Sequence, residues 1–159
     1  MRINAILMGG AFAVLAGMAT AQSREEAVSL SMLGFTSVDG DGDASLTPAE
    51  IISYGGLVFT SMDSDENEML SEQEYVDWGW GQLSLADEQG RTQAYDATRR
   101  MIHDLGDRDN DGAISMPEMT GTLAMAFGYA DLDADGALSE KEYLSGFITN
   151  VGLRNALKP

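Results

Sequence analysis

The chain has 159 residues and no cysteine, and its 26 acidic side chains outnumber nine lysines and arginines to give a formal net charge of −17. Nucleic acid and anionic membrane surfaces are excluded as expected partners, because both carry negative charge themselves. Without cysteine there is neither a disulfide framework nor a site for lipid attachment to a thiol.

The first 21 residues have the pattern of a secretory signal peptide. Arg2 supplies a positive start, residues 3–18 form an apolar run, and Ala-Thr-Ala at residues 19–21 is an A-x-A cleavage site. The run is too short to span a membrane, and no later stretch is apolar enough to do so; a buried helix is the alternative. We expect cleavage after Ala21 and a periplasmic or secreted mature chain, residues 22–159, that forms a single domain.

Four twelve-residue stretches of the mature chain place oxygen-bearing side chains at the same offsets. They cover residues 39–50, 63–74, 107–118 and 131–142, called loops one to four below, and they hold 19 of the 26 carboxylates. Calcium takes six to eight oxygen ligands, from positions 1, 3, 5, 7, 9 and 12 of such a loop. Because clustered carboxylates repel one another without a cation, the fourfold pattern predicts divalent metal sites.

Each loop offers side chains at five of these positions and a backbone carbonyl at position 7. The position-12 glutamate is expected to bind through both oxygens, and position 9 is expected to act through water. The predicted ligands are Asp39, Asp41, Asp43, Ser45, Thr47 and Glu50 in loop one; Asp63, Asp65, Asn67, Met69, Ser71 and Glu74 in loop two; Asp107, Asp109, Asp111, Ala113, Ser115 and Glu118 in loop three; and Asp131, Asp133, Asp135, Ala137, Ser139 and Glu142 in loop four.

Position 6 distinguishes the loops from one another. It needs a sharp turn at positive φ, which glycine adopts freely and which costs a residue with a Cβ roughly 1–2 kcal/mol. Gly112 and Gly136 complete the D-x-[DN]-x-[DN]-G-x5-E pattern in loops three and four, whereas loops one and two have Ala44 and Glu68. We expect loops three and four to bind calcium most strongly and loop two most weakly.

Helices are expected to enter and leave every loop, because apolar residues flank each one at helical spacing. Each loop also ends in Ser or Thr with Glu three residues later, the capping box of a helix start. A capping box alone would explain those two residues without a metal, but it would not explain the carboxylates before them. His103, the only histidine, occupies a slot that is phenylalanine at the other loops, and we expect it to pack rather than to ligate.

Only twelve residues separate loop one from loop two, and loop three from loop four. That is short for two antiparallel helices, so each half is expected to contain one shared helix of about 18 residues and 27 Å. Loops at opposite ends of a helix cannot pair, so loop two should pair with three and loop one with four. Gly55 and Gly56 weaken the first helix by about 1 kcal/mol each, and a break there would let loops one and two pair directly.

Residues 75–106 link the first pair of loops (39–74) to the second (107–142). Ser84 with Asp87 indicates a helix start, and the helix is expected to continue to residue 105 with Gly90 as a weak point.

Aromatic and sulfur-containing side chains leave two interpretations open. Trp78 and Trp80 are expected to pack against the core, although an exposed partner-binding patch is the alternative. The methionines of the mature chain are compatible with an adaptable target-binding groove, but most fall at helix positions that a core would also use. They are Met32, Met62, Met69, Met101, Met116, Met119 and Met125.

Across nearly the whole mature chain, these loops resemble the EF-hand superfamily and its exported bacterial members. The resemblance implies an all-α, compact domain of helix–loop–helix units, with short β-bridges between loops at the apolar position 8 and with up to four Ca²⁺ ions. The spacing of 24 residues between loop starts is similar to that of the lanmodulin family of periplasmic lanthanide binders. That family has proline at position 2 and an acidic residue at position 9, and this chain has neither.

The expected function is therefore calcium binding in an exported protein, as a metal-stabilised buffer or sensor. One alternative is a calcium-dependent protein-interaction module of the cell envelope that uses its Trp and Met side chains; the other is a lanthanide binder. An enzyme is not expected, because no nucleophile–base set occurs outside the loops and a single histidine leaves little acid–base capacity near neutrality.

Overall fold

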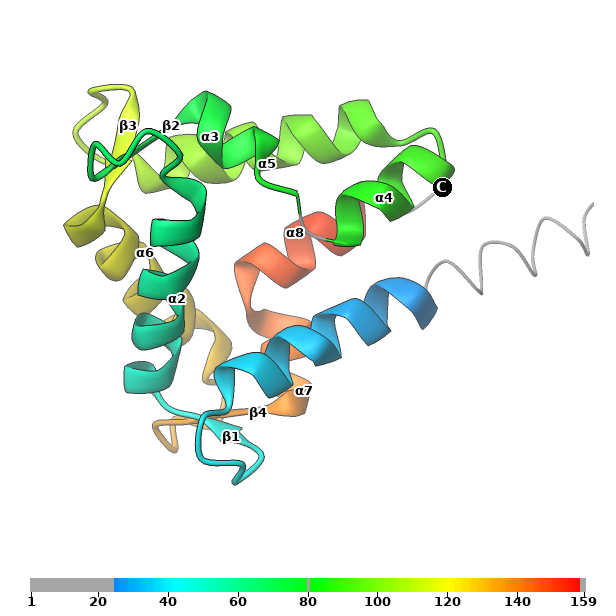
Figure 1. The fold of residues 1–159 in the computed structure, drawn as a ribbon. Coiled ribbons are helices and arrows are strands. Elements are labelled where there is room, and N and C mark those ends of the chain that lie inside the picture. Colours follow the sequence, from blue (N-terminus) through cyan, green and yellow to red (C-terminus); the bar gives the residue numbers. More distant parts are fainter. Residues whose placement is uncertain (1–24, 80, 158–159) are drawn as a thin grey trace, which may run out of the picture.

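A computed structural model describes residues 25–79 and 81–157, and the predicted signal peptide and Trp80 lie outside them. The described residues form a mostly helical protein with small antiparallel strand pairs (Figure 1). Among these residues, no helix combines the length and the apolar character that crossing a membrane requires. The prediction of an all-α protein with short strands is confirmed at this level.

Helices and two- or three-residue strands alternate along the described chain. In order, they are a helix over residues 25–38, β1 (Ser45–Leu46), α2 (Pro48–Met62), β2 (Met69–Ser71), α3 (Glu72–Asp77), α4 (Gly81–Glu88), α5 (Thr92–Gly106), β3 (Ala113–Ser115), α6 (Met116–Ala130), β4 (Leu138–Ser139), α7 (Glu140–Gly146) and α8 (Ile148–Ala156).

The shared helices are present, because α2 and α6 each run from one loop to the next without a break. Each has 15 residues rather than 18, which is about 22 Å at 1.5 Å per residue. The capping box fixes the start of each helix, and the first aspartate of the next loop ends it. In α2, for example, the N–H of Asp63 donates to the carbonyl of Phe59 at 3.0 Å. Gly55 and Gly56 lie within α2 and do not interrupt it.

The strands pair between the two halves of the chain, as predicted. β1 pairs with β4, which places Leu46 opposite Leu138, and β2 pairs with β3, which places Leu70 opposite Ile114. All four side chains are at most 2 % exposed. In Figure 1 the two strand pairs lie at opposite ends of α2 and α6. The alternative pairing of loop one with loop two is wrong.

The linker contains two helices where one was predicted. α4 begins at Gly81, three residues before the predicted start, and ends at Glu88. Gly90 has a φ of +64°, its N–H donates to the Asp87 carbonyl, and the N–H of Arg91 donates to the Ala86 carbonyl. This is a Schellman ending, which glycine favours because it accepts the left-handed conformation. The expected weak point is therefore the end of a helix.

The buried apolar side chains of the described residues form separate clusters, two of which surround the strand pairs. One cluster surrounds β1 and β4 and includes Phe35, Phe127 and Tyr143. Another surrounds β2 and β3, where Phe59 and Tyr75 pack against Ile114. A third joins the helix over residues 25–38 to α4, α5 and α8. Each strand pair is therefore packed against its own apolar cluster.

Trp78 packs against the cluster around β2 and β3 and is half-buried, so its predicted packing role is confirmed. The prediction that most methionines serve the core is wrong. Met62 is buried, but Met32, Met101, Met116 and Met125 are between 37 and 51 % exposed. In α6 the reason is that Ala126, Phe127 and Ala130 fill the buried face of the helix.

The close crossing of α2 and α6 leads to a test with neighbouring glycines. A Cβ at Gly55 would collide with Cδ1 of Leu123, whereas a Cβ at Gly56 would meet nothing within 4 Å. Gly56→Ala should raise the free energy of unfolding by about 0.5–1 kcal/mol, because alanine is favoured over glycine in a helix. Gly55→Ala has the same gain in propensity but forces Leu123 aside, and overpacking costs about 1–3 kcal/mol.

Urea unfolding of the two variants in the same buffer measures this difference. Equal stability of the Gly55→Ala and Gly56→Ala proteins would show that the helices do not approach closely at Gly55.

Candidate metal centre

Each of the four loops gathers three carboxylates whose oxygens lie within 4.8 Å of one another. Three loops contribute positions 1, 3 and 12, and loop one contributes positions 1, 3 and 5. At such distances the like charges repel strongly. Every member belongs to the predicted ligand set. The groups are Asp39, Asp41 and Asp43; Asp63, Asp65 and Glu74; Asp107, Asp109 and Glu118; and Asp131, Asp133 and Glu142.

The backbone at position 6 has positive φ in all four loops, as predicted. Gly112 and Gly136 adopt +97° and +88°, and Ala44 and Glu68 are held at +64° and +66°. The side-chain-bearing residues therefore carry left-handed strain of roughly 1–2 kcal/mol each. In every loop the position-1 carboxylate accepts the N–H of position 6 at 2.9–3.1 Å, which holds this turn in place.

Position 4 is also left-handed in every loop, which the sequence analysis missed. Gly42 has a φ of +76°, and Glu66, Asn110 and Ala134 are each at +59°. Glycine and asparagine are the residues that commonly signal this conformation, but Glu and Ala give no such signal. By backbone strain alone, loop three is the least strained and loop two, with two strained glutamates, is the most strained.

The position-12 glutamates close the loops by accepting hydrogen bonds from both ends. Glu118 is representative: Oε2 accepts the Ser115 N–H at 2.8 Å and hydroxyl at 2.7 Å, and Oε1 accepts the Arg108 N–H at 2.9 Å. The same bonds recur in the other loops. All four predicted capping boxes are therefore confirmed. The hydrogen bond from the position-2 N–H to the glutamate was not predicted, because any residue except proline can supply a backbone N–H.

These hydrogen bonds lower the pKa of all four position-12 carboxyls. The Ser71 hydroxyl and N–H lower the pKa of Glu74 to about 2, and the Ser115 N–H and hydroxyl do the same for Glu118. The pKa of Glu142 is also lowered to about 2, chiefly by Ser139, and that of Glu50 is lowered by the Thr47 N–H and hydroxyl. These side chains are therefore charged, as metal ligands must be, well below neutral pH.

Positions 5 and 7 are joined by a short hydrogen bond in each loop. The position-5 side chain accepts the N–H of position 7 at 2.8–3.0 Å. Position 7 opens the strand in loops one to three and directly precedes β4 in loop four. The position-9 hydroxyls donate to the position-12 glutamates at 2.7–2.8 Å. Whether positions 7 and 9 bind a metal stays a prediction.

Loop four contains a buried acceptor that lacks a partner. Oδ1 of Asp131 is buried, and it has no hydrogen bond among the described residues. An unsatisfied buried acceptor costs about 1–3 kcal/mol, and more when it is charged. A cation bound at this carboxylate would remove that cost, so the donor set fits a metal.

His103 lies outside these carboxylate groups. Its ring is 2 % exposed, its Nε2 lies 3.1 Å from the Leu70 carbonyl, and it contacts the Tyr75 ring edge to face at 5.7 Å between centroids. The predicted packing role is confirmed.

Comparison of the chain with protein-family models and with curated proteins gave no match in either case.

Two alanines in loop four test the left-handed strain at position 4. Ala134→Gly should raise the free energy of unfolding by about 0.5–1 kcal/mol, because relief of roughly 1–2 kcal/mol of strain exceeds the added chain entropy. Ala137→Gly, in the same loop at a position without positive φ, should lower it by about 0.5–1 kcal/mol. Thermal unfolding of both variants in calcium-free buffer measures the contrast. If both substitutions lower the free energy of unfolding, the backbone at Ala134 is not strained.

Proposed function

We propose that this chain is an exported, non-enzymatic calcium-binding protein of the EF-hand superfamily, with one domain over residues 22–159 and up to four Ca²⁺ ions. The observation that carries the proposal is that every loop gathers three carboxylates of its predicted ligand set, with one oxygen from each within 4.8 Å of the others. Calcium suits such groups because it accepts six to eight oxygens in flexible geometry. A helix before and after each loop, and strands that join the loops in pairs, also support it.

In each loop the ion would be held by the side chains of positions 1, 3, 5 and 12, with the position-7 carbonyl and position 9 completing its shell. Four ions would change the formal charge of the mature chain, which has eight basic and 26 acidic side chains, from −18 to −10. Relief of this repulsion would contribute to the folding free energy, so the calcium-free protein should be less stable.

Each strand pair joins a loop that has glycine at position 6 to a loop that lacks it. Loop one, with Ala44 at position 6, pairs with loop four and its Gly136. Loop two, with Glu68, pairs with loop three and its Gly112. We expect loops three and four to fill first and loop two to remain the weakest site. Ordering of a filled loop would then stabilise its partner through the shared strands.

The role of calcium would be that of a buffer or of a sensor. Extracellular EF-hand modules commonly bind calcium with dissociation constants of about 10⁻⁴–10⁻³ M, so the sites would fill wherever calcium is abundant. Where calcium fluctuates, the change in order would serve as a signal. The hydroxyl side chains at position 9, in place of carboxylates, favour calcium over a lanthanide as the ion.

A calcium-dependent protein-interaction module is the second candidate. The exposed fractions of Met101, Met116 and Met125, between 37 and 51 %, favour it because exposed methionines form adaptable contact surfaces. Retention on a hydrophobic resin in calcium and release by chelator is the expected behaviour of such a module. Equal behaviour on the resin with calcium and with chelator would exclude the interaction module and favour the calcium-buffering role.

Calorimetric titration of the mature chain with calcium and with magnesium tests the main proposal. Glu118→Gln should remove or weaken at least tenfold one of the tight sites, because a bidentate charged ligand is lost. Glu140→Gln removes the same charge from an exposed residue at a non-ligand position and should change calcium affinity little.

Circular dichroism and the unfolding temperature in calcium and in chelator provide the second measurement. We expect both the helical signal and the unfolding temperature to rise with calcium. Absence of both heat and spectral change would refute the calcium proposal.

A further inference from the structure

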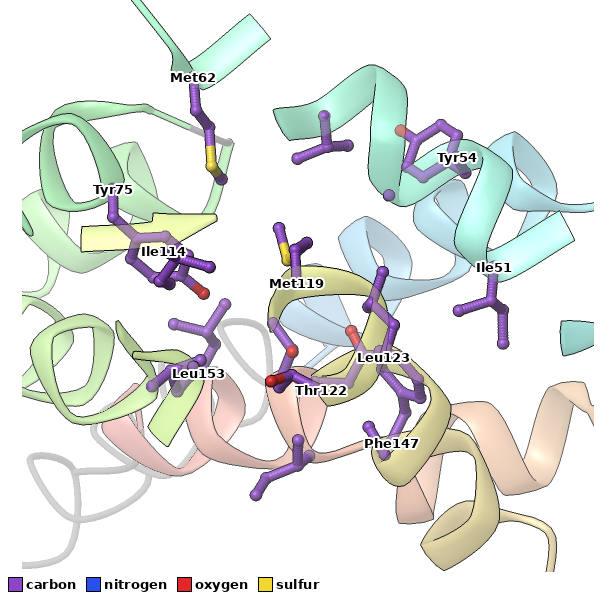
Figure 2. A pocket seen from close by; sticks show the side chains of 18 of the residues that line it. Ile51, Tyr54, Met62, Tyr75, Ile114, Met119, Thr122, Leu123, Phe147 and Leu153 are labelled. Atoms are coloured by element: carbon purple, nitrogen blue, oxygen red, sulfur yellow. The ribbon is translucent and has the colours of Figure 1, made fainter. Parts of the chain in front are cut away.

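An apolar groove lies between the two strand pairs, and none of the predicted metal ligands lines it. Its volume is about 150 Å³, and α2 borders it from Ile51 to Met62, a span of roughly 16 Å at 1.5 Å per residue. Figure 2 shows Met119 and Leu123 of α6 between the α2 side chains and those around Ile114. Such a volume over such a length is narrow, and it suits an extended alkyl chain better than a flat ring system.

A buried guanidinium lines this groove. Arg99 is 4 % exposed, and among the described residues it has no carboxylate in an ion pair. Its Nε donates to the Tyr75 carbonyl at 3.0 Å, its Nη2 donates to the same oxygen, and the cation lies 4.8 Å from the centre of the Tyr75 ring. These contacts offset part of the cost of burial, but the positive charge is not neutralised.

The guanidinium also keeps donors for a further partner. Arginine presents five N–H groups in a planar fork, and the Tyr75 carbonyl engages the Nε and Nη2 groups only. The same groove contains the Thr122 hydroxyl, which is buried and has no hydrogen-bond partner among the described residues. An apolar cavity with a few unsatisfied polar groups is the usual character of a small-molecule site.

We propose that this groove binds a medium-chain fatty acid, with its carboxylate on Arg99 and its alkyl chain along Leu123 toward Phe147. A carboxylate matches the guanidinium in charge and in its two-pronged hydrogen bonding. The strongly acidic chain disfavours free and multiply charged anions, so an apolar body is needed to hold the anion. The site uses no residue of the metal loops' ligand set and goes beyond calcium binding.

Titration of the full mature protein with sodium octanoate and with 1-octanol in calcium-containing buffer tests the charge requirement. Octanoate should bind one molecule per chain, about tenfold or more tightly than octanol, which is the range for a charge-assisted hydrogen bond. The methyl NMR signals of Ile102, Leu123 and Leu153 should shift with octanoate. No octanoate binding, equal affinity for octanol, or shifts confined to residues outside the groove would each overturn the proposal.

Neighbouring arginines provide a matched pair of variants. Arg99→Met should weaken octanoate binding about tenfold or more and leave octanol binding unchanged. Arg100→Met removes an exposed cation that pairs with Glu72 and should leave both affinities unchanged. If Arg100→Met weakens octanoate binding and Arg99→Met does not, the carboxylate does not bind at Arg99 and the proposal is wrong. Should Arg99→Met not fold, the comparison of octanoate with octanol on the unaltered protein decides.

Discussion

Repulsion between carboxylates held within 4.8 Å of one another is the constraint on which the rest of this molecule depends. The loops answer it first with their own backbone: N–H groups of positions 2, 4, 5, 6 and 9 donate to the acidic side chains in loop one. Dipoles of this kind lower the pKa of Glu118 to about 2 and so keep the charge in place rather than remove it. A bound cation would neutralise the groups, and the left-handed turns at positions 4 and 6 shape the backbone of each loop around them.

The two helices α2 and α6, each of which joins two loops, determine how the loops are arranged in the fold. α2 and α6 are bounded at their first residue by a capping box and after their last residue by the next loop's aspartate. Their length therefore fixes the separation of neighbouring loops, and each strand has to find its partner in the other half of the chain. The buried contacts of Leu46 with Leu138 and of Leu70 with Ile114 follow from that requirement.

Local patterns predicted the capping boxes, the turn at position 6 and the strand pairing, because each depends on spacings within or between the loops. Properties that depend on how helices rotate against one another were not predictable: the periodicity that places Met125 on a helix does not say that Phe127 takes the buried face. Gly90 was predicted as a weak point inside one helix and is instead the end of α4, because local sequence does not show how α4 packs on α5. Tyr75, whose carbonyl accepts the hydrogen bonds of Arg99, lies 24 residues away in sequence, so this contact could not be predicted from local patterns.

The pairing of β1 with β4 also governs the order in which the molecule can be completed. A chain is synthesised from its N-terminus, and the partner of Ser45 is Ser139 in the second half of the chain. The edge of β1 therefore stays unpaired, and open to other strands, until β4 has been synthesised. Such long-range closure slows folding, and a half of the chain, although it has two loops, would lack the partner of each of its strands.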